Sequence, residues 1–264
     1  MTGATTSRRA RSFDAWATDY DRYRPPYPDA LFYEIASRLR LPARPLVVDL
    51  GAGTGRAALA MAERGWRVTA VEPGRPMIDV MRSRAANEGL VLAMVQASAE
   101  ATGLDPASAD LATAAQAYHW FDATVALTEM ARIVRGGGGI ALFWNVRDAE
   151  RSPLVADYHA LLERFGIRSG EHSAGPIRQT AREIASIGAF EPAESFQVRH
   201  EAPMRPQEFI GLAFTASYVR ELTPEKQAKF HSELVPLVES HAAGSTVLAV
   251  PYTVDCWIAK RRGP

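Results

Sequence analysis

The chain has 264 residues, 47% of them hydrophobic, and its 30 Lys and Arg residues balance its 30 Asp and Glu residues. This composition is sufficient to fill the core of a domain of this length, and it excludes an extensively disordered chain. The absence of a basic excess argues against binding to nucleic acid, and the single cysteine excludes an internal disulfide and a cysteine-rich zinc site.

Residues 44–148 alternate between short runs of β-branched residues and longer segments rich in alanine. Buried strands are expected over residues 46–50, 67–72, 90–96, 110–115 and 140–146. Helices are expected between them, over residues 54–64, 76–86 and 122–134. Strands that alternate with helices in this way predict βαβ units, and therefore a parallel sheet with helices on both faces.

The pattern changes after residue 148. Further elements are expected as helices over residues 154–165, 180–187, 206–219 and 224–241, and as strands over residues 194–200 and 252–260. The helices at 206–219 and 224–241 are amphipathic and lie between the last two strands, so they cannot belong to the parallel sheet. We expect them to form a lid over one edge of the sheet.

A glycine-rich turn follows the first strand, and residues 47–55 read V-V-D-L-G-A-G-T-G. Glycines at this place let the backbone approach a ligand, with N–H groups pointing outward at the start of a helix. The dinucleotide fingerprint G-x-G-x-x-G would need a glycine where the chain has Arg56, which argues against a nicotinamide dehydrogenase. Glu72 ends the next strand, 21 positions after Gly51, where a carboxylate can accept both hydroxyls of a ribose.

At these residues the chain resembles the class I S-adenosylmethionine-dependent methyltransferases, and within them the small-molecule, type 11-like group. Three further segments carry the resemblance: Y-D-R-Y-R-P-P-Y-P at 20–28, Q-A-Y-H-W-F at 116–121 and W-N-V-R-D at 144–148. In one departure from the family pattern, four glycines at 136–139 replace the P-G-G turn that usually precedes the fifth strand. This departure alters a turn and no catalytic group.

The resemblance implies an α/β fold, namely a Rossmann-like, doubly wound, mostly parallel seven-stranded sheet with helices on both faces and a helical lid. It implies a single domain over residues 1–264. Within it we expect an N-terminal helical cover at 1–36, a cofactor-binding core at 44–148 and a helical lid at 203–243, inserted before the last strand. The expected cofactor is S-adenosyl-L-methionine, and the expected product is S-adenosyl-L-homocysteine.

The resemblance also assigns cofactor contacts to the carboxyl ends of the strands. The glycine-rich turn would line the methionine part, Glu72 would hold the ribose, and Arg24 would pair with the cofactor carboxylate. The residues expected to bind the cofactor are Arg24, Asp49, Gly51, Ala52, Gly53, Glu72, Pro73, Met77, Ser98, Ala99, Glu100 and Gln116. Two of them have structural alternatives, since Asp49 could cap the loop and Arg24 could only tie down the terminus.

Two residues are candidates for the chemistry. His119 follows the fourth strand, and it is either a general base for a hydroxyl or amine acceptor or a residue that packs under the lid. A carboxylate acceptor would need no base. Tyr20 could cover the methyl group or orient the acceptor. The aromatic residues expected to line the acceptor pocket, unless they are ordinary core residues, are Tyr23, Trp120, Trp144, Phe214 and Tyr218.

The resulting hypothesis is methyl transfer from S-adenosylmethionine to an oxygen, nitrogen or carbon atom of a small molecule. Methylation of RNA or protein has less support, because the chain has neither a basic face nor an N-P-P-Y-like tetrapeptide. A third hypothesis is a protein that binds S-adenosylmethionine without transferring its methyl group, since the binding residues would be the same. The sequence does not identify the acceptor.

The sequence also sets expectations for location and partners. No apolar run reaches the ~20 residues that span a bilayer, and the first twenty residues lack the apolar segment of a signal peptide. We therefore expect a cytoplasmic protein with no membrane or nucleic-acid partner. The histidines are dispersed, and we expect no metal site. The choice between a monomer and a homo-oligomer stays open.

Overall fold

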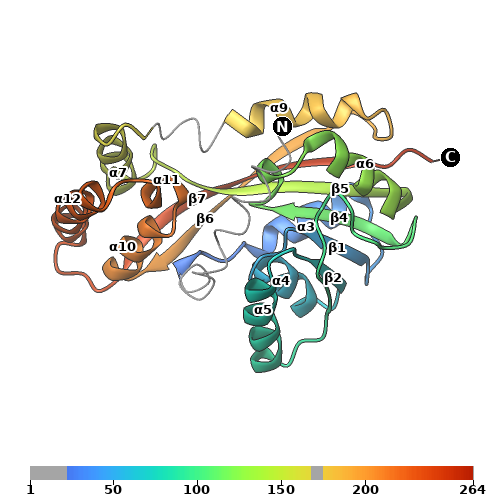
Figure 1. The fold of residues 1–264 in the computed structure, drawn as a ribbon, viewed down its shortest axis with the longest axis horizontal. Helices are drawn as coiled ribbons and strands as arrows, with labels where there is room; N and C mark the ends of the chain where they lie inside the picture. Colours follow the sequence, from blue (N-terminus) through green and yellow to red (C-terminus); the bar gives the residue numbers. More distant parts are fainter. Residues whose placement is uncertain (1–22, 168–174, 264) are drawn as a thin grey trace.

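The computed structural model describes residues 23–167 and 175–263 of the chain. The expectations for residues 1–22, which include the role of Tyr20 and most of the N-terminal cover, lie outside this part. One seven-stranded sheet runs through the molecule (Figure 1). Its strands are β1 (Leu46–Leu50), β2 (Arg67–Val71), β3 (Ala93–Val95), β4 (Ala109–Ala115), β5 (Val134–Arg147), β6 (Glu194–Met204) and β7 (Leu248–Lys260).

The strand order is β3-β2-β1-β4-β5-β7-β6. The pairs from β3 to β5 are all parallel, and β7 runs antiparallel to both of its neighbours. The chain builds β2 and β3 on one side of β1 and then crosses to β4 on the other side, so the sheet is doubly wound with a switch point between β1 and β4. The predicted α/β fold with a mostly parallel seven-stranded sheet is confirmed.

Helices cover both faces of the sheet. Successive side chains of each strand point to opposite faces, so each strand contributes to the core on both sides. The helices are α3 (Asp29–Leu39), α4 (Arg56–Glu63), α5 (Arg75–Glu88), α6 (Ala123–Ile133), α7 (Pro153–Arg164), α9 (Gly175–Ser186), α10 (Pro206–Phe214), α11 (Ser217–Arg220) and α12 (Pro224–Ala242). In β1, Val47 belongs to a core cluster with Phe32 of α3. The next residue, Val48, belongs to the cluster on the other face, with Leu127 of α6 and Ile184 of α9.

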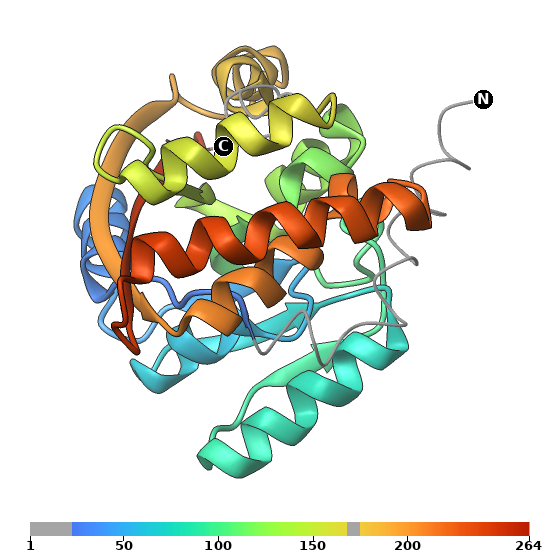
Figure 2. The ribbon, with the colours of Figure 1, turned by 90° about the vertical axis from the view of Figure 1, so that its left-hand side faces the viewer.

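A third apolar cluster lies at one end of the long strands β5, β6 and β7, among α7, α10, α11 and α12 (Figures 1 and 2). Its buried members include Tyr158, Phe209 and Phe230. Three of these helices lie between β6 and β7 in the chain, and α7 joins them directly from β5. We refer to the four helices together as the lid. It differs from the expected lid by the addition of α7.

The expected helix over residues 206–219 is divided into α10 and α11. The division lies at Ala216, whose φ of −72° and ψ of 131° are extended rather than helical. One extended residue is sufficient to end the run of helical hydrogen bonds, and hydrophobic periodicity alone does not reveal it.

The fifth strand begins earlier than its sequence indicated, because it includes the four glycines. Its pairing with β4 jumps from Val134 to Gly139, so the residues between them form a bulge. A Cβ atom on Gly138 would lie 2.5 Å from the carbonyl oxygen of Asp110. The glycines are therefore part of the strand, at a place where two backbone segments approach closely.

A buried carboxylate on α6 holds the loop that follows β3. Glu129 accepts hydrogen bonds from the backbone N–H of Thr102, at 2.9 Å, and from its hydroxyl group. Arg132 donates to both oxygens of Glu129 at 2.7 Å. The bond from Arg132, followed by those from Thr102, lowers the pKa of Glu129 to about 2. The position of the loop therefore depends on an ionised carboxylate.

We expect Glu129→Ala to lower the free energy of unfolding at neutral pH by about 1–3 kcal/mol, because it leaves two buried donors of Thr102 without an acceptor. Arg132→Ala removes only the more exposed partner and should cost about 1 kcal/mol or less. The stability that ionised Glu129 adds is present above its ordinary pKa of 4.5 and is lost as the pH falls toward 2. Urea denaturation at about pH 7 and about pH 3 measures both effects, and equal costs for the two substitutions would contradict this account.

Candidate active site

The glycine-rich turn lies at the switch point, at the carboxyl end of β1. Its glycines have positive φ angles, of 65° at Gly51, 56° at Gly53 and 85° at Gly55, which other residues adopt only with strain. A Cβ atom on Gly51 would lie 2.7 Å from Cβ of Ala117, so this glycine lets the turn pack against the loop after β4. A Cβ atom on Gly53 would meet no atom of the described residues within 4 Å, which leaves room beside this part of the backbone.

One carboxylate joins the turns that follow β1 and β2. Glu72 accepts the backbone N–H of Gly53 at 2.9 Å with one oxygen, and that of Gly74 at 2.8 Å with the other. The residue predicted to hold the ribose is thus in direct contact with the turn predicted to line the methionine part.

Asp49 lies in β1 beneath the turn and is buried. Its Oδ1 accepts the hydroxyl of Thr113 in β4 at 2.7 Å, and the backbone N–H of Ala58, in the first turn of α4, also favours its ionised form. Burial raises the pKa of Asp49 to about 7, the bond from Thr113 opposes this change, and the charge of Glu72 adds to it. Asp49 therefore links two strands across the switch point, and it carries a charge that changes near neutral pH.

The residues predicted around the adenine lie after β2 and β3, on the same edge of the sheet as Glu72. They are Pro73, Met77, Ser98, Ala99 and Glu100. Pro73 is exposed, whereas Met77 and Ala99 are buried. Glu100 accepts the backbone N–H of Asp122 at 3.1 Å, which joins this loop to the start of α6. The structure brings these positions together, and their contact with a cofactor stays a prediction.

Three of the segments singled out in the sequence meet at Asn145. Gln116, whose φ is 55°, donates from Nε2 to the carbonyl oxygen of Asn145 at 2.9 Å. Nδ2 of Asn145 donates to the carbonyl oxygen of Pro26 at 3.4 Å, and its Oδ1 lies 2.8 Å from Nε2 of His200. Sequence reasoning predicted Gln116 but missed Asn145 and His200. The segment W-N-V-R-D was the available indication for Asn145, whereas no sequence pattern indicated His200.

His119 is exposed at the carboxyl end of β4, next to two predicted pocket residues. The indole N–H of the buried Trp144 donates to Nδ1 of His119 at 3.2 Å, and the ring of Trp120 lies 4.9 Å from the imidazole ring. Because Nδ1 accepts this bond, a neutral imidazole carries its proton on Nε2. The ring then presents a donor to its surroundings rather than a free lone pair.

The other predicted pocket residues lie in the lid or pack against it. Tyr23, Phe214 and Tyr218 are partly buried against its apolar cluster. A Cβ atom on Gly211 of α10 would come within 2.6 Å of the Tyr23 ring, so this glycine lets the ring lie directly on the helix. Arg24 follows and is half-buried. The predicted pocket residues thus form two groups, one beside His119 and one in the lid.

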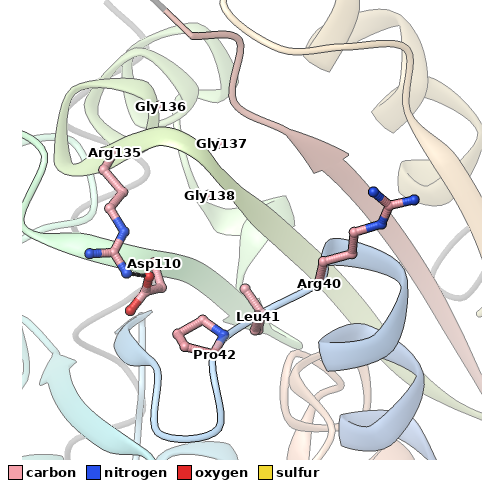
Figure 3. Close-up of a pocket in the computed structure, with 8 residues that line it drawn as sticks. All are labelled: Arg40, Leu41, Pro42, Asp110, Arg135, Gly136, Gly137 and Gly138. Atoms are coloured by element: carbon pink, nitrogen blue, oxygen red, sulfur yellow. Dashed lines mark ion pairs between the residues drawn. The ribbon is translucent and has the colours of Figure 1, made fainter.

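A hollow of about 320 Å³ lies at the amino ends of β4 and β5, near the end of α3 (Figure 3). It is lined by Arg40, Leu41, Pro42, Asp110, Arg135, Gly136, Gly137 and Gly138. Arg135 forms an ion pair with Asp110, which also accepts the backbone N–H of Leu46 at 2.7 Å. The hollow is at the opposite edge of the sheet from the glycine-rich turn, and its acid is already paired, so we assign it no role in the candidate site.

Two other kinds of feature are absent from residues 23–167 and 175–263. No helix there is long and apolar enough to cross a bilayer. No group of three or more His, Cys, Asp or Glu side chains there is arranged to hold a metal ion.

Several known proteins that are similar to this chain are methyltransferases. The family described as a methyltransferase domain matches residues 48–142. An uncharacterized methyltransferase of Mycobacterium tuberculosis is 33% identical over 257 residues, which are 96% of this chain and 97% of the relative. The solved structure of a candidate type II methyltransferase from Anaeromyxobacter dehalogenans is 29% identical, with a TM-score of 0.65 over 92% of this chain and 99% of that one.

A more distant structure is similar in fold. Phosphoethanolamine N-methyltransferase 2 of Haemonchus contortus, in complex with phosphomonomethylethanolamine and S-adenosylhomocysteine, is 16% identical. Its TM-score is 0.56, over 97% of this chain and 59% of that one.

The buried carboxyl group of Asp49 predicts an unusual pH dependence of stability. Its pKa is about 7 in the folded chain and ~3.9 in an unfolded one, so between these values the folded chain holds a proton that the unfolded chain has lost. The free energy of unfolding therefore falls as the pH rises through this range. Asp49→Asn removes the ionisation, and its stability relative to the wild type should increase by about 2–3 kcal/mol between pH ~5 and pH ~8.

Urea denaturation of the two proteins at both pH values measures this difference. Thr113→Val removes the hydroxyl that stabilises the ionised form of Asp49, and it should steepen the loss of stability with pH. A stability difference between Asp49→Asn and the wild type that does not change with pH would show that the buried carboxyl group keeps an ordinary pKa.

Proposed function

This chain belongs to the class I S-adenosylmethionine-dependent methyltransferases, and we propose that it binds S-adenosylmethionine at the glycine-rich turn and transfers the methyl group to a small molecule. The observation that carries the proposal is the carboxylate of Glu72, which joins the turns after β1 and β2. The carboxylate lies where the backbone at Gly53 and the end of β2 adjoin. A ribose there would donate both hydroxyls to one carboxylate.

The residues around this carboxylate fit the remaining parts of the cofactor. Gly51, Ala52 and Gly53 provide backbone without large side chains for the methionine part. Pro73 and Met77 follow Glu72 on one side, where the adenine would lie. Gln116 is held by Asn145 beside the glycine-rich turn, at the amino-acid end. We assign Arg24 to the cofactor carboxylate as part of the same proposal.

When bound, S-adenosylmethionine supplies a methyl group on a positively charged sulfur. Transfer of that group needs a nucleophile held in line with the methyl carbon and protected from water. The protein's own contribution is therefore mainly to position the acceptor, and the family requires no single catalytic side chain for this. The two groups of aromatic residues, beside His119 and in the lid, would hold an acceptor with apolar parts.

His119 would act on the acceptor through its exposed edge. Trp144 fixes the ring by donating to Nδ1, so Nε2–H can donate to an oxygen or nitrogen of the acceptor. To act as a general base from Nδ1, the ring would have to give up the Trp144 bond. We therefore favour orientation of the acceptor by His119, with general-base catalysis as the alternative for a hydroxyl or amine acceptor.

The wider assignments follow from the same proposal. Residues 44–148 form the cofactor-binding core, residues 203–243 belong to the lid, and the chain acts as a single domain in the cytoplasm. A balanced net charge supports a small acceptor over RNA.

Calorimetry of the full chain with S-adenosylmethionine, S-adenosylhomocysteine and NADH tests the cofactor assignment. We expect micromolar binding of the two sulfur compounds and no binding of NADH. Glu72→Ala should weaken S-adenosylmethionine binding by about 100-fold or more, because two hydrogen bonds to a charged group are lost. Glu88→Ala, at the exposed end of α5, is the control and should leave the affinity unchanged. Unchanged affinity in Glu72→Ala, with the fold intact by circular dichroism, would refute the ribose assignment.

A second test concerns His119, using an acceptor found by screening for S-adenosylhomocysteine formation. His119→Ala should lower kcat by about 10–100-fold while the Kd for S-adenosylmethionine changes by less than about 3-fold. Trp144→Phe removes the bond to Nδ1 and should lower kcat in the same direction by a smaller factor. Equal losses of turnover and cofactor affinity would indicate that His119 contacts the cofactor. Formation of no S-adenosylhomocysteine with any acceptor, despite tight cofactor binding, would favour a binding protein that does not transfer the methyl group.

A further inference from the structure

Arg147, the last residue of β5, lies at the boundary between the sheet and the lid. It is in register with Tyr252 of β7, so the two side chains lie on the same face of the sheet. Two residues of extended strand separate it from Asn145, which corresponds to about 7 Å. Arg147 therefore lies beyond the point where the three sequence segments meet, farther from the glycine-rich turn.

Aromatic side chains of the lid surround the guanidinium group. Its central carbon lies 4.8 Å from the ring centroid of Tyr158 in α7 and 5.4 Å from that of Phe209 in α10. Nε of Arg147 and the hydroxyl oxygens of Tyr158 and Tyr252 are buried, and none of the three atoms has a hydrogen-bond partner within the described residues. The phenol groups of Tyr158 and Tyr252 interact with the guanidinium, and Tyr218 interacts with Tyr158. One cation and its neighbouring phenol groups are thus gathered in one place without a carboxylate partner among the described residues.

Arg147 differs in this respect from other arginines of the fold. Ion pairs join Arg132 to Glu129, Arg135 to Asp110 and Arg164 to Glu233. No ion pair joins Arg147 to a carboxylate in the part of the chain that the structure describes. The adjacent Asp148 is engaged elsewhere, since it accepts the hydroxyl of Thr253 and the backbone N–H of Glu150, both at 3.2 Å.

A cation placed in this way is unfavourable unless an anion joins it. Burial removes the hydration of the guanidinium, and contacts with aromatic faces restore only part of the loss. A guanidinium fork and phenol O–H groups are all donors to an oxyanion, and their combination matches a carboxylate or a phosphate group.

We propose that Arg147, with the hydroxyl groups of Tyr158 and Tyr252, binds a carboxylate or phosphate group of the methyl acceptor. The inference rests on the proposed function, and it adds the chemical class of the acceptor. The acceptor is favoured over the cofactor as the source of the anion, because most of the proposed cofactor residues lie after β1, β2 and β3 and the cofactor carboxylate is assigned to Arg24. Arg147 lies under the lid at the end of β5, on the other side of β4.

The test measures thermal unfolding of the full chain with saturating S-adenosylhomocysteine, in potassium chloride, potassium benzoate or potassium phosphate at equal ionic strength. We expect benzoate or phosphate to raise the Tm of the wild type by about 2–4 °C relative to chloride. Benzamide, a neutral molecule with the shape of benzoate, should have no such effect. Arg147→Met should abolish the shift, and comparison of the two proteins cancels general salt effects on stability.

Two further variants keep the inference falsifiable if Arg147→Met does not fold. Tyr252→Phe retains the arginine and removes one buried hydroxyl, and it should raise the apparent Kd for benzoate or phosphate several-fold. Arg164→Met is the matched control, because Arg164 is an exposed arginine of α7 that pairs with Glu233. Its anion-dependent shift should equal that of the wild type.

An equal shift in the wild type, Arg147→Met and Tyr252→Phe, or no shift of the wild type with either anion, would overturn the inference. Calorimetry with S-adenosylhomocysteine separates this result from the cofactor assignment. If Arg147→Met binds S-adenosylhomocysteine with unchanged affinity but no longer shows the anion-dependent Tm shift, the acceptor role is supported. A large loss of affinity in that variant would assign the arginine to the cofactor and overturn the inference. Absence of binding by the wild type would instead refute the proposed function, and with it the assignment to an acceptor.

Discussion

The geometry of the candidate site depends on one carboxylate. Glu72 directly follows β2, and its two oxygens accept N–H groups from the turns after both β1 and β2. Backbone N–H groups in a turn need an acceptor, and here a side chain provides it where no strand or helix can. The position of Gly53, and with it the open space beside the turn, therefore follows from Glu72. Asp49 is buried beneath the turn, close enough to Glu72 for the charge of Glu72 to raise its pKa.

The connection between this site and the lid runs along β5. That strand has 14 residues, against 5 in β1, so its last residues extend beyond the parallel core. Asn145 lies where it leaves the core and joins Gln116 on one side to His200 of β6 on the other. Arg147 then carries a positive charge between helices of the lid. One strand thus presents polar groups to both halves of the candidate site, at positions separated by the fixed spacing of an extended chain.

The sequence was informative where structure depends on neighbouring residues. Strand and helix alternation predicted the parallel core, and the glycine spacing with Glu72 predicted which strand ends come together. It was less informative where structure depends on distant pairing. His200 reaches Asn145 only because β6 and β7 add to β5 in one particular register, and no local pattern encodes this register. The division between α10 and α11 and the glycine bulge of β5 are likewise set by tertiary contacts, not by helical periodicity or by glycine content.

The strand order also determines how the sheet ends. β3, at one edge, has only 3 residues, and short edge strands offer little backbone to another chain. β6, at the other edge, is long, but it carries Glu194, Arg199 and Glu201, and Pro203 removes one donor near its end. Charged side chains and proline on an edge oppose pairing with a foreign strand. Growth of the sheet by strand addition is thus disfavoured at both edges, which protects this fold from edge-to-edge aggregation.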